Sequence, residues 1–263
     1  MRKLLLLLFL LPFYCPAQEN HLSDKAIISV ITCGPSQEEL YTAFGHSAIR
    51  VFDPKYNFDA VYNYGVFDFN QPNFYLNFAK GFLYYKLGVY DYQNFQAHYV
   101  MDNRYVHEQV LNLNQHQKQK LFDYLQNNAL PQNQSYPYDY FYNNCATKIR
   151  DVIEAALGKE NVTFDGSYIK TKYTIRDLTD IYLRDQPWGD LGIDICLGLP
   201  MDKVATPYEY MFLPDYIESG FDHAYIKNDN GKEPIVKSKN PVYEVRAQDP
   251  LPALPHPLYF FTA

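Results

Sequence analysis

The stretch NNCAT (residues 143–147) places a cysteine, Cys145, at the point where a helix is expected to begin. Much earlier in the chain, FGHSAIRV (residues 44–51) places His46 at the start of an expected β-strand. A thiol is a strong nucleophile only as a thiolate, and a helix N-terminus and a nearby imidazole both lower its pKa. The sequence therefore predicts a cysteine–histidine pair, provided that folding brings the two side chains together.

The residues around these two stretches predict helices and hairpin strands. Asn144 is a typical N-cap residue, and its helix is expected to end before Gly158. Residues 46–52 have the pattern of a strand, residues 53–57 that of a turn, and residues 58–64 that of a returning strand. Hairpins interleaved with helices indicate an antiparallel sheet with segregated helices, which is an α+β fold.

Further helix starts are expected from residues that cap a helix. Asn114 precedes a segment with an apolar face, and three stretches match the capping-box pattern, in which the first and fourth residues exchange hydrogen bonds. These stretches begin at Ser36, Thr174 and Thr206. They predict helices that follow each of these residues.

Cys145 is the candidate nucleophile of an acyl-transfer site. The N–H groups at its helix start, together with Asn144 or Asn143, are the candidate oxyanion donors. Because Cys145 also lies on the apolar stripe of its helix, a buried structural cysteine is the alternative interpretation.

His46 is the candidate general base, and a core histidine with its hydrogen bonds satisfied is the alternative. A catalytic imidazole usually needs a third group that orients the ring. Asn63 in the returning strand is the best polar candidate. Tyr62 and Tyr64 are the other two, because the sequence does not fix the register of the hairpin.

The first seventeen residues have the features of a secretory signal peptide. Arg2 and Lys3 precede an apolar run, and small residues lie at the expected cleavage position before Gln18. We therefore expect export to the periplasm or cell envelope. The exported part holds three cysteines, at positions 33, 145 and 196, and an odd number leaves at least one thiol free. Their pairing stays open.

The composition of the chain excludes some classes of partner. A net charge of −7 argues against binding to nucleic acid. The 26 tyrosines supply half-apolar rings that suit a lipid or sugar interface, with ordinary strand and core tyrosine as the alternative. His98, His107 and His116 are nine residues apart, a spacing that turns successive side chains to opposite sides of a helix. We expect no metal and no cofactor.

Several motifs, in order along the chain, resemble one protein family. They are TCGP (residues 32–35), FGHSAIRV (44–51), NYG (63–65), FDF (67–69), NR (103–104), DYFYNNCAT (139–147), RD (150–151) and MFLPDY (211–216). Together they resemble the N-terminal periplasmic domain of the bacterial lipoprotein N-acyltransferase Lnb. More distantly, the order of histidine strand and cysteine helix is similar to that of the circularly permuted NlpC-type, papain-like thiol enzymes, which include lecithin–retinol acyltransferase.

The resemblance implies a papain-like domain over residues 18–222. The change in composition after this domain, with Asn230-Gly231 and four prolines in residues 250–257, predicts a small appendage and proline-rich linker over residues 223–263. The resemblance also implies Cys145 as nucleophile, His46 as general base and Asn63 as the orienting residue. The implied reaction moves an acyl chain from a phospholipid to the thiol and then to the N-terminus of a lipoprotein, at a membrane surface and without a cofactor. Longer family members continue into a membrane-spanning part, so this chain is expected to be either truncated before such a part or a stand-alone relative.

Two other functions are compatible with the sequence. The first is a cysteine amidase or peptidase that acts on cell-wall peptides, in which water replaces the amine acceptor. The second is a non-catalytic binding module of the cell envelope, with His46 and Cys145 in its core. A fatty-acyl adduct on Cys145 would favour acyl transfer, and a peptidyl adduct would favour hydrolysis.

Overall fold

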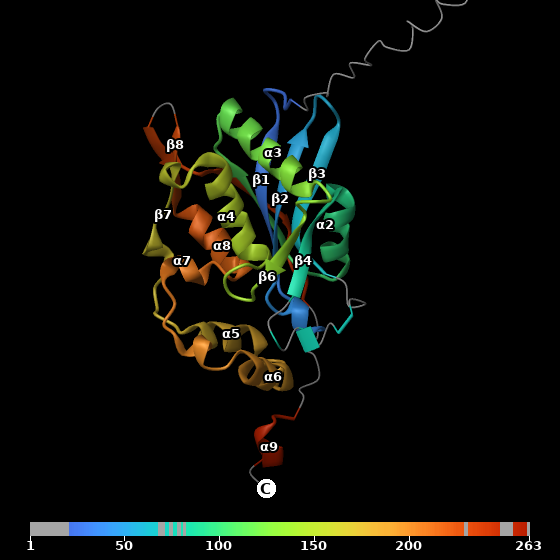
Figure 1. Cartoon of the computed structure of the whole chain (residues 1–263), viewed down its shortest axis with the longest axis vertical. Coiled ribbons are helices and arrows are strands. Elements are labelled where there is room, and N and C mark those ends of the chain that lie inside the picture. The colour runs from blue at the N-terminus through green and yellow to red at the C-terminus, as the bar shows by residue number, and fades with distance from the viewer. Residues whose placement is uncertain are drawn as a thin grey trace, which may run out of the picture.

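The computed structural model describes residues 21–67, 72–73, 76–77, 80, 83–228, 231–247 and 255–261. The predicted signal peptide, residues 1–17, lies outside the described residues, as does much of the proline-rich linker. The described residues form mixed helices and antiparallel sheets, so the predicted α+β class is confirmed. Figure 1 shows the whole arrangement.

The centre of the fold is a seven-stranded antiparallel sheet with the order β10-β5-β1-β2-β3-β4-β6. A second sheet has three strands in the order β7-β8-β9. The strands are β1 (Ile27–Cys33), β2 (His46–Asp53), β3 (Phe58–Val66), β4 (Leu83–Asp91), β5 (Val106–Leu111), β6 (Ser135–Tyr138), β7 (Val162–Phe164), β8 (Ala224–Asn228), β9 (Gly231–Pro234) and β10 (Val236–Tyr243).

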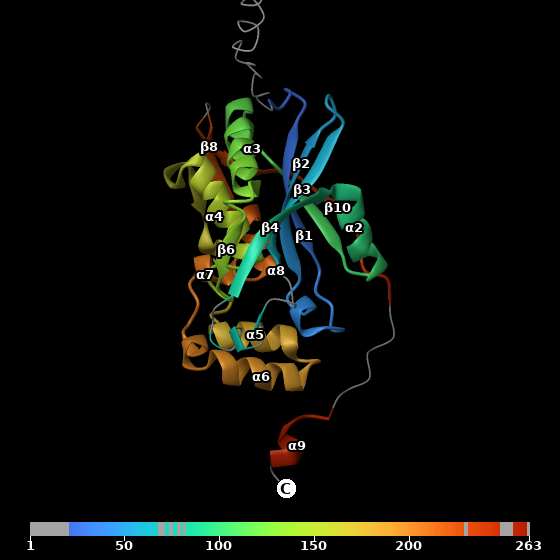
Figure 2. The ribbon, with the colours of Figure 1, turned by 45° about the vertical axis from the view of Figure 1, so that its right-hand side comes forward.

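Helices cover both faces of the large sheet (Figure 2). The helix α2 lies on one face, and α3, α4 and α8 lie on the other. The helices are α2 (Tyr92–Met101), α3 (Gln115–Ala129), α4 (Cys145–Leu157), α5 (Ile175–Leu183), α6 (Pro187–Leu197), α7 (Pro207–Tyr210), α8 (Pro214–Asp222) and α9 (Leu258–Phe261).

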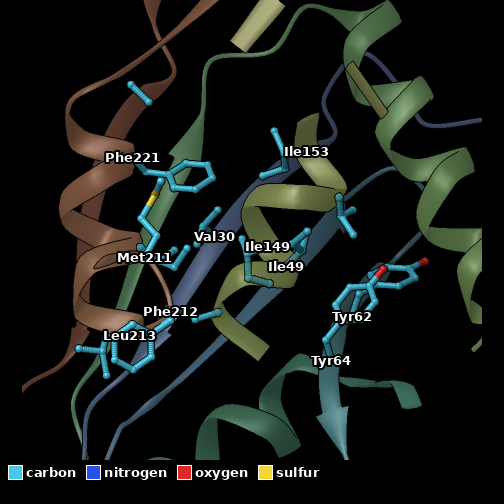
Figure 3. Close-up of a cluster of buried hydrophobic side chains, with 14 of the residues drawn as sticks. Val30, Ile49, Tyr62, Tyr64, Ile149, Ile153, Met211, Phe212, Leu213 and Phe221 are labelled. Carbon is cyan, nitrogen blue, oxygen red and sulfur yellow. The ribbon is translucent and has the colours of Figure 1, made fainter. Parts of the chain in front are cut away.

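The larger hydrophobic core lies between the sheet and the layer that contains α4 and α8. Figure 3 shows Ile49 of β2 and Tyr62 of β3 beside Ile149 and Ile153 of α4, with Phe221 of α8 close by. All five side chains are almost fully buried. Burial of an aliphatic or aromatic side chain of this size contributes about 1.5–3 kcal/mol. This packing fixes the start of α4 relative to the strands that lie beneath it.

The smaller core, between the sheet and α2, uses the opposite side of the same strands. Ala48 of β2 and Val61 of β3 face Phe95 and Tyr99 of α2. Side chains alternate between the two faces of a strand, so His46 points to the same face as Ala48. The side chain of His46 therefore meets α2, while α4 begins beyond the other face of the sheet.

Local sequence rules predicted most of these elements. The hairpin of β2 and β3 forms as expected, with Asp53 opposite Phe58. Helices α3, α5 and α7 begin after Asn114, Thr174 and Thr206, and each has a complete capping box. These predictions held because capping depends only on residues within one turn of the chain.

The helix that we expected after Ser36 does not form, so this prediction is wrong. The structure has only a short 3₁₀ turn, Leu40–Thr42, whose N-cap residue Glu39 makes no capping hydrogen bond. The Thr42 hydroxyl donates to the carbonyl oxygens of Ser36 and Glu39, at 3.0 and 2.8 Å. These bonds close a compact loop between β1 and β2 in place of a helix.

Part of the segment that we expected to be a C-terminal appendage lies in the main sheet. β10 pairs with β5 and forms the edge of the seven-stranded sheet, while β8 pairs with β7 in the small sheet. The side chains of β10 are mostly exposed, and Lys237 and Lys239 lie within it. A polar, lysine-bearing edge strand has no apolar alternation, so its place in the sheet leaves little trace in the sequence.

Candidate active site

Cys145 is the first residue of α4, as the sequence predicted. Asn144 has an extended backbone, and its Oδ1 accepts hydrogen bonds from the N–H groups of Ala146 and Thr147, both at 2.9 Å. The Thr147 hydroxyl in turn accepts from the N–H of Asn144 at 2.9 Å. This capping box satisfies donors that the helix start leaves unpaired, and it holds Cys145 at the end of the helix.

The cap is also attached to other parts of the chain. The side-chain amide of Asn144 donates to the carbonyl oxygens of Tyr140 and Phe212, at 2.9 and 2.8 Å. The side-chain amide of Asn143 donates to the carbonyl oxygen of Pro137 at 2.5 Å. Both amides, which we considered as oxyanion donors, are thus engaged within the protein. Among the described residues the backbone N–H of Cys145 donates to no oxygen, so it is the better candidate.

His46 begins β2, and its ring is held on two sides. The Nε2 atom lies 2.5 Å from the Oδ1 atom of Asn63 on β3. An amide oxygen only accepts a hydrogen bond, so Nε2 carries the proton and Nδ1 is the basic nitrogen. The ring also stacks on Tyr99 of α2, with centroids 6.2 Å apart, and contacts Phe95 at 6.3 Å.

Of the three candidates for the orienting residue, the structure brings only Asn63 to the imidazole. Tyr62 and Tyr64 lie one position away on β3, so their rings point to the opposite face and into the larger core (Figure 3). The sequence could not choose among the three because a shift of one residue reverses every side chain of a strand.

Cys145 and His46 both lie beside Gly65. β3 has an irregular register between Asn63 and Val66, and Gly65 within it has a φ of +91°. A Cβ atom at Gly65 would lie 3.1 Å from the Cβ of Cys145 and 3.8 Å from the Cε1 of His46. Both side chains therefore border one small space that only glycine leaves open.

The Cys145 thiol lies close to the backbone of the histidine strand. The N–H of Ser47, the residue after His46, is near enough to the sulfur to lower the pKa of the thiol. Both Cys145 and His46 are half-buried, so neither is enclosed in the core.

Burial decides the charge of the pair. It raises the pKa of the Cys145 thiol to about 11, although N–H groups of Ser47, Ala146 and Cys145 itself act in the other direction. Burial likewise lowers the pKa of His46 to about 4, against the hydrogen bond to Asn63. The expectation that the helix start yields a thiolate is thus corrected, since desolvation outweighs it. At neutral pH the pair is a thiol and a neutral imidazole.

Aromatic rings surround the thiol. Tyr85, Tyr138 and Tyr140 lie close enough to Cys145 for its charge to raise their pKa values, after the larger effect of burial. The rings of Tyr85 and Tyr138 stack with centroids 4.0 Å apart, and Phe44 packs edge-on against Tyr140 at 5.5 Å. The surroundings of the sulfur are therefore largely apolar and suit a hydrocarbon group.

The helices α5 and α6 lie beyond the end of the sheet at which β2 begins (Figures 1 and 2). The side chain of Gln37, in the loop before His46, donates to the carbonyl oxygen of Tyr182 at 2.9 Å. The side chain of Gln186 donates to the carbonyl oxygen of Gln37 at 3.1 Å. The loop that leads into the histidine strand is thereby fixed to the end of α5 and to the residue that precedes α6.

The other two cysteines take no part in the pair. Cys33 is buried at the end of β1, opposite His46 in the register, and Cys196 is exposed in α6. All three described cysteines are free thiols, so the pairing that the sequence left open is not realised.

Across the described ranges, one group of side chains has the spacing of metal ligands. Asp180 of α5 and Asp190 and Asp194 of α6 each place an oxygen within 4.8 Å of the others. Burial, followed by the charges of its two neighbours, raises the pKa of Asp180 to about 6. Arg176 donates to Asp194 and to Asp202, and so supplies positive charge at the same place.

Sequence reasoning missed three contributors to the site. Gly65 leaves room for the pair, Tyr99 supports the imidazole, and Arg104 places a positive charge that lowers the pKa of His46. Arg104 appeared in the sequence only within the NR motif and without a role, whereas Gly65 had a structural indication, because a glycine inside a strand often marks a bulge or a close approach.

Comparison with known proteins supports the assignment that the motifs predicted. The profile of the Lnb N-terminal periplasmic domain matches residues 17–180. Comparisons with curated proteins and with solved structures give no match, so the likeness to papain-like enzymes stays a prediction. Within the described part of the chain, none of the helices has the length and apolar character needed to cross a membrane. The motifs, the order of histidine and cysteine, and the matched profile together show that this exported, periplasmic chain belongs to the family of the Lnb N-terminal periplasmic domain.

Proposed function

We propose that this chain is a thiol acyltransferase of the cell envelope that N-acylates bacterial lipoproteins and uses a phospholipid as acyl donor. The observation that carries the proposal is that Cys145 and His46 both border Gly65, with Asn63 hydrogen-bonded to Nε2 of the imidazole. Membership of the Lnb family supports the choice of substrates.

In the first step the Cys145 sulfur attacks the ester carbonyl carbon of the phospholipid. Because the resting sulfur is a thiol, its proton passes to Nδ1 of His46 as the S–C bond forms. The carbonyl oxygen takes up the negative charge, and the free N–H of Cys145 at the helix start can stabilise it. When the ester C–O bond breaks, the lysophospholipid oxygen takes the proton from His46, and a thioester remains.

In the second step the α-amine of a lipoprotein's terminal cysteine attacks the thioester carbonyl carbon. His46 accepts the amine proton and returns it to the sulfur as the C–S bond breaks. The products are an amide and the original thiol, so no external oxidant or reductant is needed. The hydrogen bond to Asn63 keeps Nδ1 available for both transfers.

The aromatic surroundings of the sulfur favour this donor. Tyr85, Tyr138 and Tyr140 present ring surface near Cys145, and a fatty-acyl chain gains about 0.8 kcal/mol for each methylene that it buries.

Trapping the covalent intermediate tests the proposal. The full-length protein is incubated with phospholipid vesicles in the absence of an amine acceptor, digested, and analysed by mass spectrometry. We expect a fatty-acyl group on the peptide that contains Cys145, removable by hydroxylamine as a thioester is. Addition of a diacylated lipopeptide with a free N-terminus should transfer the group to that amine.

The exposed Cys196 provides the control for non-specific acylation. Cys196→Ala should retain the adduct, and Cys145→Ala should abolish it. An adduct formed only with cell-wall peptides would favour the amidase or peptidase alternative. Retention of lipoprotein N-acylation by Cys145→Ala in cells would instead favour a non-catalytic module.

A further inference from the structure

Arg104 is a buried arginine without a counter-charge. It lies between α2 and β5, and the residue is only 4% exposed. Nε donates to the carbonyl oxygen of Gly34 at 2.7 Å, and the guanidinium lies over the ring of Tyr99, 4.6 Å from its centroid. No carboxylate of the described residues lies within ion-pair distance of it, and its two terminal nitrogens donate to none of these residues.

The half-buried Arg50 and the buried Arg150 show how unusual this is. Arg50 pairs with Asp59 and Glu108, and Arg150 pairs with Asp151. A buried charge without a partner is strongly unfavourable, so a folded protein normally supplies one.

The terminal nitrogens of Arg104 are nevertheless not completely enclosed. Neither is among the enclosed polar atoms that lack a partner in the described ranges of the chain. A guanidinium has five N–H donors in a planar fork, and only the one on Nε is used here. The guanidinium of Arg104 is thus held by the hydrogen bond from Nε and by the ring of Tyr99. Its terminal N–H groups are left for a ligand.

The fork lies beside the catalytic pair. Gly34 follows Cys33, which is opposite His46 in the sheet, and Tyr99 stacks on both the imidazole and the guanidinium. The positive charge of Arg104 also lowers the pKa of His46 and of Cys145.

The thiols of the site do not supply the missing negative charge. Burial raises the pKa of Cys33 and of Cys145 well above neutrality, so both are uncharged at pH 7. On Cys145 the influence of Arg104 is also smaller than that of the backbone N–H groups. A role limited to activating the sulfur therefore leaves the unpaired fork unexplained.

We propose that Arg104 is a substrate-binding residue whose guanidinium pairs with the phosphate diester of the acyl donor and so places the donor's ester beside Cys145. Guanidinium and phosphate match in geometry and bind through paired, charge-assisted hydrogen bonds. The identity of this ligand rests on the proposed function, because a phospholipid is the donor that carries both a phosphate and an acyl ester.

Binding without turnover tests this role. The Cys145→Ala variant of the full-length chain is titrated calorimetrically with dihexanoyl-phosphatidylglycerol below its micellar concentration, with the neutral dihexanoylglycerol, and with inorganic phosphate. We expect the phospholipid to bind at least about tenfold more tightly than the neutral lipid, since a hydrogen bond to a charged group contributes about 1.5–3 kcal/mol. Weaker binding of inorganic phosphate than of the phospholipid would identify the lipid headgroup as the source of the anion.

Substitution of Arg104 gives the second arm. In the Cys145→Ala background, Arg104→Gln should remove the preference for the phospholipid and leave binding of dihexanoylglycerol within about twofold. Arg104→Lys should retain part of the preference. Arg184→Gln removes an exposed arginine, 78% accessible, and should leave the preference unchanged.

Equal binding of the two lipids by the protein that retains Arg104 would overturn the inference, and so would a preference that survives Arg104→Gln. If Arg104→Gln does not fold, the comparison of the two lipids on the Cys145→Ala protein still decides. Because the Cys145→Ala protein lacks the sulfur, its lipid binding is measured without acyl transfer. A failure of phosphate binding can therefore be told apart from a failure of acyl transfer.

Discussion

Gly65→Ala is the substitution that challenges the geometry of the site most specifically. The new Cβ would lie 3.1 Å from the Cβ of Cys145, whereas carbon atoms pack best at about 3.5–4.0 Å. Relief of that contact requires a shift of roughly 0.4–0.9 Å between β3 and the start of α4. The φ of +91° adds a backbone cost of about 1–3 kcal/mol for any L side chain.

Thiol acyl transfer is sensitive to such a shift, because a misplacement of about 1 Å can reduce a rate roughly 100-fold. We therefore expect Gly65→Ala to lower the rate of Cys145 acylation by about 10–100-fold. The assay is single-turnover acylation by a soluble thioester, followed by intact mass spectrometry, together with urea unfolding.

Gly231→Ala is the matched control. Gly231 also has a positive φ, +109°, but a Cβ there meets no atom within 4 Å. It should therefore lose a similar amount of stability and acylate Cys145 at the wild-type rate. The reasoning is refuted if Gly65→Ala acylates within about twofold of wild type, or if Gly231→Ala loses as much activity.

Three further predictions concern the cap, the orienting residue and the thiol. Asn144→Ala should lower the free energy of unfolding in urea by about 2–4 kcal/mol, because it removes a cap and leaves buried groups unpaired. Asn144→Asp should lower it less, and equal losses in the two variants would contradict the role of Asn144 as a cap. Asn63→Ala should reduce acylation of Cys145 about 10–100-fold, whereas Tyr64→Phe on the opposite face should leave it unchanged; a loss in both would implicate the strand as a whole. The rate of Cys145 alkylation by iodoacetamide should rise about tenfold per pH unit from pH 7 to 10, because burial raises the thiol pKa to about 11 and the thiolate fraction grows as pH rises. A rate that is constant below pH 8 would instead indicate a preformed ion pair of thiolate and imidazolium.

The parts of the site that could be predicted from the sequence are local. Asn144 caps α4 because its side chain reaches N–H groups two and three residues away, and the β2–β3 hairpin follows from alternation and a turn. These patterns need no knowledge of distant residues. They were enough to place Cys145 and His46 each at the end of an element.

The remaining features depend on contacts between distant segments. The open fork of Arg104 becomes visible only when its neighbours are known, since neither Gly34 nor Tyr99 marks it in the sequence. The direction of the thiol pKa depends on how many atoms surround Cys145, and packing alone sets that. A helix start indicates a lowered pKa, and here the surrounding rings reverse it.

The most direct test of the account is whether acylation of Cys145 requires the imidazole of His46. The single-turnover rate of acylation is measured for the wild type and for His46→Ala, without and with added imidazole. Loss of a general base should reduce the rate by about 10²–10⁴-fold, and added imidazole should restore part of it. A His46→Ala protein that acylates its cysteine as fast as the wild type would contradict the account.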